Sequence, residues 1–410
     1  MTDARELLIR RIGAQGDGVA DLDGAPVFVP FTLPGERIEA EVDGERARLE
    51  RVLVPSPERI APVCKHFGKC GGCSVQHMAS ATYAEWKRNL VVDAFRSRGL
   101  EPIVDDLQRT AGKRRRAVMR AVRTATGVAL GFYEASSHDL VEIEECPVLE
   151  PKIVAAFPDI GNLIAPLISK RGEARVAITL TKSGLDVEVT GTERQLTAEV
   201  RSTLASKASD LKLARLVIGS ELVVETLHPF LTFGTADVIL PPGVFVQAVE
   251  EVETEIARRV VAAVGKAKAV ADLFSGMGAF TFPLAARSRV SAFDGDKAAV
   301  AALASAAKKT SGLKPITATV RDLFREPLST LELNEHDAVV FDPPRAGAEA
   351  QSQRLTKSKV KTVVAVSCNP ATLARDARHL VDGGYKIESV TPIDQFLYSA
   401  HVEVVAVFRR

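Results

Sequence analysis

From residue 239 to the C-terminus, short apolar stretches alternate with amphipathic ones, and this alternation constrains the fold more than any other feature of the chain. Apolar stretches of strand length lie at 270–274, 290–293, 317–320, 338–341 and 362–366. Stretches with helical periodicity lie between them, at 279–286, 297–308, 348–356 and 371–381. Strands that alternate with helices predict an α/β fold with a doubly wound, mostly parallel sheet. Its last two strands are predicted at 386–391 and 401–408.

The first of three motifs that follow predicted strands is rich in glycine. Gly276 and Gly278 lie in DLFSGMGA (272–279), where a strand ends and a helix begins. Glycine lets the backbone turn tightly and approach a ligand closely. The next strand ends in Asp294, and an acid there can accept hydrogen bonds from ribose hydroxyls. The two features favour an adenosyl ligand; a glycine turn kept only for packing is the alternative.

The other two motifs follow the fourth and fifth predicted strands. Ligands of open α/β sheets bind at the carboxyl ends of the strands, so these motifs face the same crevice. Asp342 and Arg345 flank two prolines that fix the backbone. Cys368 precedes a helix, whose N-terminal dipole is expected to lower the thiol pKa below its usual ~8.5. A lone cysteine is more often an inert buried residue, but its place at this edge favours a nucleophile.

His401 and Glu403 begin the last predicted strand. Residues i and i+2 of a strand share a face, so we expect the imidazole and the carboxylate to project together. Either group could act as a general base. A salt-bridged surface strand would show the same pattern.

Four of the five cysteines have spacings typical of a ligand set. Their odd total and clustered spacing argue against a secreted disulfide framework. Four thiolates can hold zinc or an iron–sulfur cluster. Zinc sites usually show two C-x2-C pairs, whereas here glycines crowd between the thiols, which favours a cluster. The four residues are Cys64, Cys70, Cys73 and Cys146.

The first 60 residues predict a small closed barrel. Short alternating stretches punctuated by glycine lie at 6–12, 18–21, 26–30, 37–42 and 46–54. Such barrels often bind nucleic acid, although a purely structural barrel is the alternative. The prolines at 55, 57 and 62 mark a linker. Residues 80–235 mix helical and β-rich stretches and cannot be ordered from the pattern.

Charge is balanced overall but uneven along the chain. The net charge is +1, yet the segment 109–123 has seven basic residues and no acid, sufficient for several phosphate contacts. A solvated charged face is the alternative, although such faces usually mix signs. These seven residues are Arg109, Lys113, Arg114, Arg115, Arg116, Arg120 and Arg123. The sequence shows no targeting or membrane segment, so we expect a cytoplasmic protein that does not bind membranes.

Taken together, these motifs resemble the RNA uracil-C5 methyltransferase family, whose members make 5-methyluridine with S-adenosylmethionine. The barrel resembles a TRAM domain through GDGVA (16–20), VFVP (27–30) and LPGE (33–36). The four cysteines resemble the 4Fe–4S ligands of the family. Segments 132–138 and 146–149 resemble its central domain, and SCNPATLARD (367–376) and HVE (401–403) are its most specific signatures.

The resemblance implies a class I, Rossmann-like methyltransferase domain at 239–410. It also implies a TRAM (OB-like) RNA-binding barrel at 1–60 and a central α+β iron–sulfur domain that binds RNA at 61–238. Cys368 matches the nucleophile that adds to C6 of uracil, and Glu403 matches the base that removes the C5 proton. The glycine loop (Gly276, Gly278) and five further residues match positions that bind S-adenosylmethionine: Gln247, Phe274, Asp294, Asp322 and Asp342.

A TRAM barrel combined with a cluster resembles the branch that modifies 23S rRNA more than the tRNA branch. The expected reaction is therefore methylation of C5 of a uridine in 23S rRNA by a monomer. A tRNA uracil-C5 methyltransferase and a non-catalytic iron–sulfur RNA-binding protein are the alternatives. A DNA methyltransferase is disfavoured by the barrel and the cluster. The sequence does not give the target nucleotide, because RNA shape and splayed bases also select it.

Overall fold

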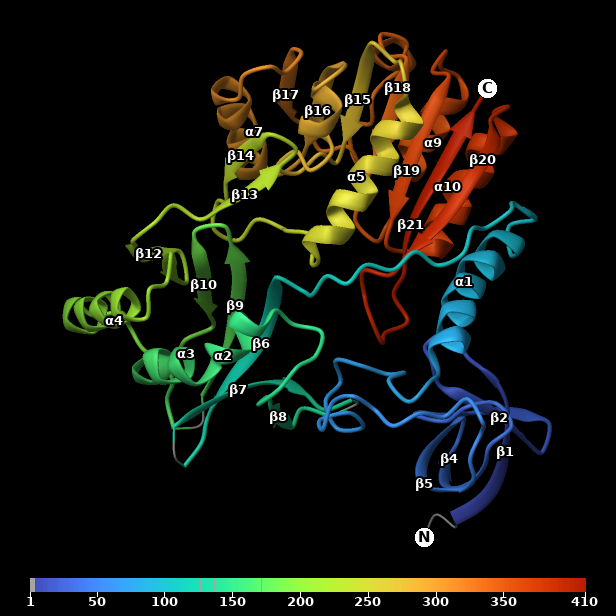
Figure 1. Ribbon diagram of the computed structural model, residues 1–410, viewed down its shortest axis with the longest axis vertical. Coiled ribbons are helices and arrows are strands. Elements are labelled where there is room, and N and C mark those ends of the chain that lie inside the picture. Colours follow the sequence, from blue (N-terminus) through green and yellow to red (C-terminus); the bar gives the residue numbers. More distant parts are fainter. Residues whose placement is uncertain (1–3, 126, 136, 171) are drawn as a thin grey trace.

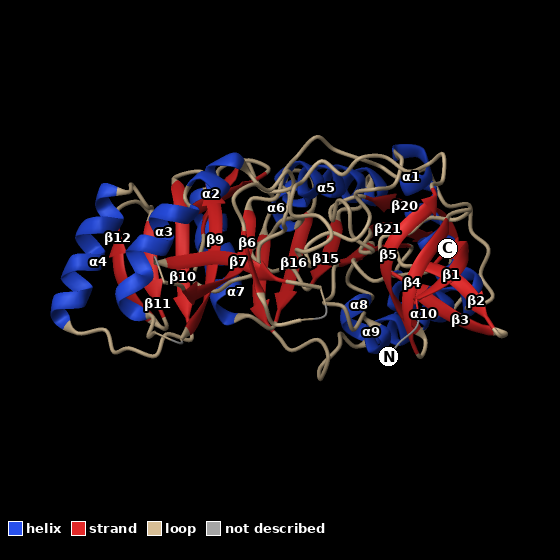
Figure 2. Ribbon diagram, turned by 90° about the horizontal axis from the view of Figure 1, so that it is seen from below, coloured by secondary structure: helices blue, strands red, loops and turns tan. Residues whose placement is uncertain are grey.

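The computed structural model describes residues 4–125, 127–135, 137–170 and 172–410. Residues 1–3, at the start of the predicted barrel, and Ser136, within the segment 132–138, lie outside the described residues. Figure 1 shows a barrel near the N-terminus, a central sheet and a C-terminal sheet, with α1 between the barrel and the C-terminal sheet. Seen from below, the central sheet with α4 lies at one end of the molecule and the barrel at the other (Figure 2).

The N-terminal strands close into the predicted barrel in the order β1-β2-β3-β5-β4. Alternate residues such as Leu7 and Ile9 point inward and pack against Val29 and Ile38. Gly18 is required by packing, because a Cβ there would lie 2.0 Å from Oγ1 of Thr32. The strands are β1 (Ala4–Ile12), β2 (Gly18–Leu22), β3 (Ala25–Val29), β4 (Arg37–Asp43) and β5 (Arg46–Val54).

The middle of the chain forms a second sheet, of order β12-β11-β10-β9-β6-β7-β8. Its strands are β6 (Arg116–Arg123), β7 (Val128–Tyr133), β8 (Leu140–Glu142), β9 (Glu173–Thr181), β10 (Gly184–Thr190), β11 (Arg215–Ile218) and β12 (Glu221–Glu225). Its apolar side chains pack against the helical segments α2 (Pro151–Ala155), α3 (Phe157–Ile164), η1 (Ala165–Leu167) and α4 (Ala198–Asp210). A hairpin of β13 (Phe230–Phe233) and β14 (Ala236–Ile239) follows.

The C-terminal sheet has the order β17-β16-β15-β18-β19-β21-β20. The five strands from β17 to β19 are parallel, as the alternation predicts, and β21 runs antiparallel between β19 and β20. The strands are β15 (Ala269–Leu273), β16 (Arg289–Asp294), β17 (Ile316–Val320), β18 (Ala338–Phe341), β19 (Thr362–Ser367), β20 (Lys386–Ile393) and β21 (Glu403–Arg409). The helices are α1 (Ser80–Arg96), α5 (Glu250–Val264), α6 (Thr281–Ala285), α7 (Lys297–Lys309), α8 (Thr330–Leu333), α9 (Glu349–Thr356) and α10 (Pro370–Asp382).

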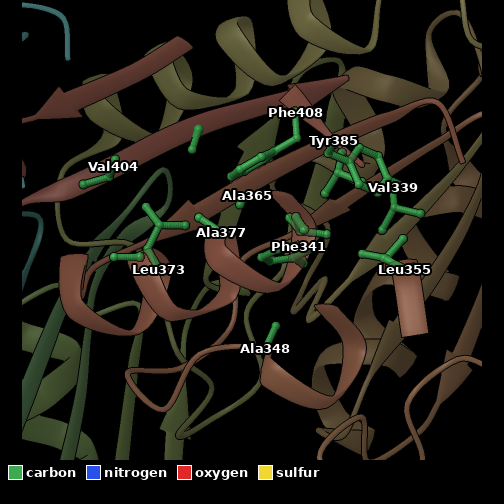
Figure 3. Packing of buried hydrophobic residues seen from close by; sticks show 14 of the residues in the cluster. Val339, Phe341, Ala348, Leu355, Ala365, Leu373, Ala377, Tyr385, Val404 and Phe408 are labelled. Atoms are coloured by element: carbon green, nitrogen blue, oxygen red, sulfur yellow. The ribbon is translucent and has the colours of Figure 1, made fainter. Parts of the chain in front are cut away.

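Helices cover both faces of this sheet, and each strand sends alternate side chains to opposite faces. On one face Phe341 and Phe408 pack against Leu373 of α10 and Leu355 of α9 (Figure 3). On the other face, neighbouring residues of the same strands pack against α5, which contributes Ile256 among others. The buried strands are held on both sides, so the loops at their carboxyl ends extend from a rigid base.

No helix among the described residues is long and apolar enough to cross a membrane.

Candidate active site

A cavity of about 800 Å³ lies at the carboxyl ends of the parallel strands. The order of the strands reverses between β15 and β18, and ligands of such sheets bind at this point. The cavity brings together eight of the nine residues predicted to be catalytic or to bind cofactor. These eight are Gln247, Phe274, Gly276, Asp294, Asp322, Asp342, Cys368 and Glu403.

The ninth residue, Gly278, does not line this cavity. Its φ is 99°, and an added Cβ would lie 2.7 Å from the ring of Phe282. Gly278 therefore makes room for helix packing, and its part in cofactor binding stays a prediction. Gly276 has φ 51°, and an added Cβ would meet no atom within 4 Å. Its backbone N–H donates to Oδ2 of Asp294 at 2.8 Å.

Two of the predicted acids also shape the backbone of the cavity wall. Asp294 accepts a second hydrogen bond, from the N–H of Asp296 to Oδ1 at 2.8 Å. Oδ1 of Asp322 accepts from the N–H of Phe324 at 3.0 Å. The Phe324 ring then lies against Phe274, with 5.3 Å between ring centroids. These carboxylates hold the turns that form the wall, and each carboxylate keeps a lone pair for a ligand.

A chain of hydrogen bonds links the remaining polar residues of the cavity. Nε2 of Gln247 donates to Oδ2 of Asp342 at 3.1 Å. Nε2 of Gln395 donates to Oε1 of Gln247 at 2.9 Å and to Oε2 of Glu403 at 3.0 Å. The chain joins the loops that precede α5 and follow β18 and β20 to the first residue of β21.

Burial makes the acids of this cavity hard to ionise. Burial raises the pKa of Asp342 to about 7, and the nearby Glu253 acts in the same direction. Burial, followed by the Asp342 charge, raises the pKa of Glu403 well above its ordinary value. Burial also raises the pKa of Asp272, beneath the glycine loop, to about 7. A proton acceptor with a raised pKa suits general base chemistry near neutral pH.

Cys368 lies between the end of β19 and α10, as predicted, but the expected lowering of its pKa is wrong. Burial, followed by the Glu403 and Asp342 charges, raises the pKa of the thiol to about 11. Asn369, the N-cap of α10, uses its own side chain to accept from the N–H of Ala371 at 3.1 Å. The Arg345 charge opposes the rise without overcoming it.

The raised pKa predicts how Cys368 reacts in the free protein. Only the thiolate reacts with iodoacetamide, so below a pKa of about 11 the alkylation rate should rise about tenfold per pH unit. We expect this rise between pH 7 and pH 10, measured by mass spectrometry of the peptide that contains residue 368. A rate that levels off near pH 8 would contradict the assigned environment. The Cys368→Ser variant lacks this thiol, so its loss of the alkylated peptide identifies the signal of Cys368.

His401 lies outside the strand in which it was predicted. β21 begins at Glu403, so the argument that the two residues share a strand face is wrong. Glu403 is buried, whereas His401 is exposed in the preceding loop and accepts a hydrogen bond at Nδ1 from Nη2 of Arg345 at 2.9 Å. Burial and the Arg345 charge lower the pKa of His401. Both residues nevertheless line the cavity.

The loop between β20 and β21 is anchored by residues distant in sequence. The carbonyl of Tyr398 accepts from the N–H groups of Ser74 and Val75 at 2.9 and 3.2 Å. Earlier in the loop, Asp394 is buried between two partners on α1. It accepts from Nζ of Lys87 at 2.5 Å and from the Tyr83 hydroxyl at 2.8 Å; these residues are buried too. The loop that leads to Glu403 is thus fixed by α1 and by the cysteine segment.

A second, larger cavity opens next to the first. It measures about 1070 Å³ and lies between the barrel, α1 and the loops around Cys368. Arg345, Cys368 and His401 line both cavities, so the thiol lies where they meet. The barrel contributes Arg10 and Arg11, cations that suit a phosphate backbone.

The basic strip at 109–123 is less available for phosphates than its sequence predicts. Arg115 is buried, donates to Oε1 of Glu253 at 2.9 Å and donates to the carbonyl of Gln247 at 3.2 Å. Arg120 forms an ion pair with Glu173 at 3.3 Å. Arg115 therefore helps to hold the central sheet to the C-terminal sheet, and Arg120 pairs within the central sheet. The pattern of charge alone cannot separate these structural cations from those that face solvent.

The four predicted cluster ligands have thiol chemistry consistent with a shared site. None of them forms a disulfide. The N–H of Gly72 donates to Sγ of Cys70 at 3.4 Å, as thiolate ligands require. Burial, with the Cys146 and Cys70 charges, raises the pKa of Cys73 to about 11. Within the described residues, no group of three or more His, Cys, Asp or Glu is arranged to hold a single metal ion, and the 4Fe–4S cluster stays a prediction.

Gln395 and Phe245 are among the cavity residues that were not predicted as part of the site. Gln395 follows β20, a strand parallel to β19, so its place after a strand end was a usable signal. Phe245 is 66% exposed, with the Arg116 guanidinium 5.9 Å from its ring centroid. It lies in an irregular segment before α5, where no periodicity distinguishes it from an ordinary loop residue.

Comparison with known proteins assigns this chain to a family. The sequence profile of the tRNA (Uracil-5-)-methyltransferase family matches residues 214–410, and that of the TRAM domain matches residues 3–46. An uncharacterised RNA methyltransferase of Brucella melitensis is 48% identical, over 99% of this chain and 98% of the relative. The 23S rRNA (uracil(1939)-C(5))-methyltransferase RlmD of Chromohalobacter salexigens is 34% identical, over 98% of this chain and 89% of that protein.

Among solved structures, the tRNA (uracil-54, C5)-methyltransferase of Pyrococcus abyssi, in complex with S-adenosyl-L-homocysteine, has a TM-score of 0.76. The match covers 98% of this chain and 100% of that chain at 24% identity, so it concerns the fold. The strand order and the cavity at the switch point define a class I S-adenosylmethionine-dependent methyltransferase. Within that class, the chain belongs to the RNA uracil-C5 methyltransferase family.

Proposed function

We propose that this protein transfers a methyl group from S-adenosylmethionine to C5 of a uridine in 23S rRNA. The observation that carries the activity is one cavity in which a thiol, a buried carboxyl and the glycine loop meet. The choice of rRNA is supported by the 34% identity to the rRNA enzyme along nearly the whole chain and by the TRAM match. In this proposal the barrel (1–60), the central part (61–238) and the methyltransferase part (239–410) are the three domains.

The cofactor would lie against the wall formed by the glycine loop. Phe274 and Phe324 offer apolar surface for its base, and Asp294 and Asp322 offer acceptors for its hydroxyls. Gln247 and Asp342 lie toward Glu403, where its reactive end would meet the uracil. When bound, S-adenosylmethionine supplies an electrophilic methyl group.

Cys368 and Glu403 then have complementary roles. C5 of uracil is a poor nucleophile, so Sγ of Cys368, as the thiolate once its proton has passed to solvent, would first add to C6 and place the electrons of the C5–C6 double bond on the enolate. C5 of the enolate would then bond to the methyl group as the bond between that methyl and the sulfonium sulfur breaks, and the sulfur would keep the electron pair and leave as the thioether of S-adenosylhomocysteine. Glu403 would accept the C5 proton, and the electrons of that C–H bond would restore the double bond as the C6–S bond breaks. Cys368 leaves as a thiolate, ready for another turnover.

The substrate is tested by methylation of unmodified RNA with labelled S-adenosylmethionine. We expect label in the 5-methyluridine of 23S rRNA transcripts and none in total tRNA transcripts. Label in tRNA alone would establish the tRNA alternative. Mass mapping of rRNA from a strain that lacks the gene, compared with its parent, then identifies the nucleotide.

We also propose that Cys64, Cys70, Cys73 and Cys146 hold a 4Fe–4S cluster that shapes the RNA-binding surface. The N–H donation to Cys70 supports this site, and the effect of the thiols on one another's pKa shows that they lie close together. Anaerobically purified protein should contain about four iron and four sulfide per chain and absorb near 400 nm. Cys146→Ser should lose this absorbance, and Cys368→Ser should keep it. Zinc without sulfide in the purified protein would overturn the assignment.

The exposed Phe245 should contribute to RNA binding. Bases stack on exposed aromatic rings, and each such contact contributes about 1–3 kcal/mol. Phe245→Ala should therefore weaken RNA binding by about tenfold or more, measured by filter binding. Leu331→Ala, which removes an exposed apolar side chain on α8, is the matched control. If Phe245→Ala and Leu331→Ala bind RNA with equal affinity, Phe245 does not belong to the RNA interface.

A further inference from the structure

Gln395 lies at the centre of the hydrogen-bond chain in the cavity. Its side chain is 2% exposed, and its Nε2 uses both hydrogens, toward Oε1 of Gln247 at 2.9 Å and Oε2 of Glu403 at 3.0 Å. Gln247 in turn donates to Asp342 at 3.1 Å. One amide group thus joins the carboxyl of β21 to the loops before α5 and after β18.

The orientation of the Gln395 amide follows from its neighbours. Nε2 of Gln247 faces the Asp342 carboxyl, so Gln247 presents its oxygen to Gln395. Reversing the Gln395 amide would place its oxygen against the Oε1 of Gln247, with no hydrogen between the two. Only the orientation with the NH2 group toward both acceptors satisfies them.

This orientation leaves polar atoms unpaired in the cavity. Oε1 of Gln395 and Oε1 of Glu403 are buried and have no hydrogen-bond partner. An unpaired buried acceptor is unfavourable for stability and calls for an explanation. For Glu403 the explanation is that one oxygen is held by Gln395 while the other stays free for a proton.

We propose that Gln395 is a positioning residue that holds Glu403 by Oε2 and leaves the unpaired Oε1 as the proton acceptor. This inference rests on the proposed function, in which Glu403 removes the C5 proton. Gln395 also links Glu403 to Gln247 and Asp342 by hydrogen bonds. These bonds fix the position of Glu403 relative to the end of the cavity where the methyl donor would lie.

The N–H donated by Gln395 favours the ionised form of Glu403 and opposes the effect of burial on its pKa. The other groups that act on Glu403 come from neighbouring loops. Asp342, after β18, raises its pKa, and Cys368, after β19, would add a like charge once ionised. The charged or titratable groups that share the cavity with them are Arg114, Arg116, Glu253, Asp294, Asp296, Asp322, Arg345 and His401.

The test replaces Gln395 by methionine, which keeps the length of the side chain and removes both donors. In single-turnover reactions, Gln395→Met should form the covalent RNA adduct at the wild-type rate and resolve it about tenfold more slowly or worse, because hydrogen bonds to charged groups are strong. The rate of resolution should recover as the pH is raised, since Glu403 then ionises without its donor. Gln353→Met, the same change at an exposed site on α9, should behave as wild type.

A second measurement does not depend on RNA. Infrared titration of the free protein, with the Glu403 band assigned by its loss in Glu403→Gln, should show a pKa of Glu403 about one unit higher in Gln395→Met. Gln395→Glu, which keeps the polar shape, serves if the methionine variant does not fold, and should also raise that pKa. Unchanged resolution or an unchanged Glu403 titration would overturn the role of Gln395. Wild-type protein that methylates no uridine would instead overturn the proposed function, while the titration still decides the hydrogen bond.

Discussion

Replacement of Cys368 by alanine should abolish methyl transfer, with a loss of at least about 10⁴-fold in turnover. No other group at the junction of the two cavities is a comparable nucleophile toward C6 of uracil in the part of the chain that the structure describes. Without addition at C6, C5 stays too electron-poor to take a methyl group. The measurement is incorporation of labelled methyl groups into RNA, with the covalent adduct followed on denaturing gels.

Cys368→Ser is the matched variant, because serine keeps the size of the side chain but is a far weaker nucleophile. Both variants should keep the wild-type melting temperature and bind S-adenosylmethionine as wild type in calorimetry, since the thiol is at the edge of the proposed cofactor wall. Methylation by Cys368→Ala at the wild-type rate would refute the role of the thiol. It would leave the fold and the family assignment untouched.

Replacement of Glu403 by glutamine should have the opposite effect on the adduct. Addition of Cys368 and transfer of the methyl group do not need this carboxylate, whereas removal of the C5 proton does. Methylated RNA should therefore stay covalently bound to the protein, and turnover should fall by at least about 10³-fold. The adduct is measured as a labelled band of protein and RNA on a denaturing gel.

Glu388→Gln is the control for this experiment. It makes the same chemical change on the neighbouring strand β20, at an exposed carboxylate that pairs with Arg409. Its turnover should equal that of wild type, with no adduct. An adduct in Glu388→Gln as well, or none in Glu403→Gln, would mean that another group removes the proton.

The C-terminal sheet was predictable because each of its strands and helices shows a pattern within a short stretch of sequence. Stretches such as 338–341 and 363–366 are apolar throughout, as strands buried on both faces must be, and the structure places strands there. Because helices alternate with these strands, only a few arrangements of a parallel sheet are possible. Boundaries were less certain where a loop meets a strand, as at His401, which lies before β21 rather than in it.

The environment of a side chain, by contrast, depends on residues that are distant in the sequence. The position of Cys368 before a helix was correctly predicted, but its pKa depends on burial and on Glu403 and Asp342, which come from other strands. Gly278 shows the same limit, since its missing Cβ makes room for the Phe282 ring, a partner that the glycine motif does not reveal. The links of Gln395 to Gln247 and Glu403 likewise exist only once the chain has folded. A sequence pattern identifies such residues as candidates and leaves their partners undetermined.

The anchoring of Tyr398 by Ser74 and Val75 has a consequence for how the protein is made. The hydrogen bond from Oγ of Ser74 to the Tyr398 carbonyl joins residues 324 positions apart. At synthesis rates of about 5–20 residues per second, the segment with the first three cysteines is outside the ribosome for roughly 16 to 65 seconds before its partner loop is made. During that interval its thiols are open to solvent, so metal insertion and oxidation compete for them in the nascent chain.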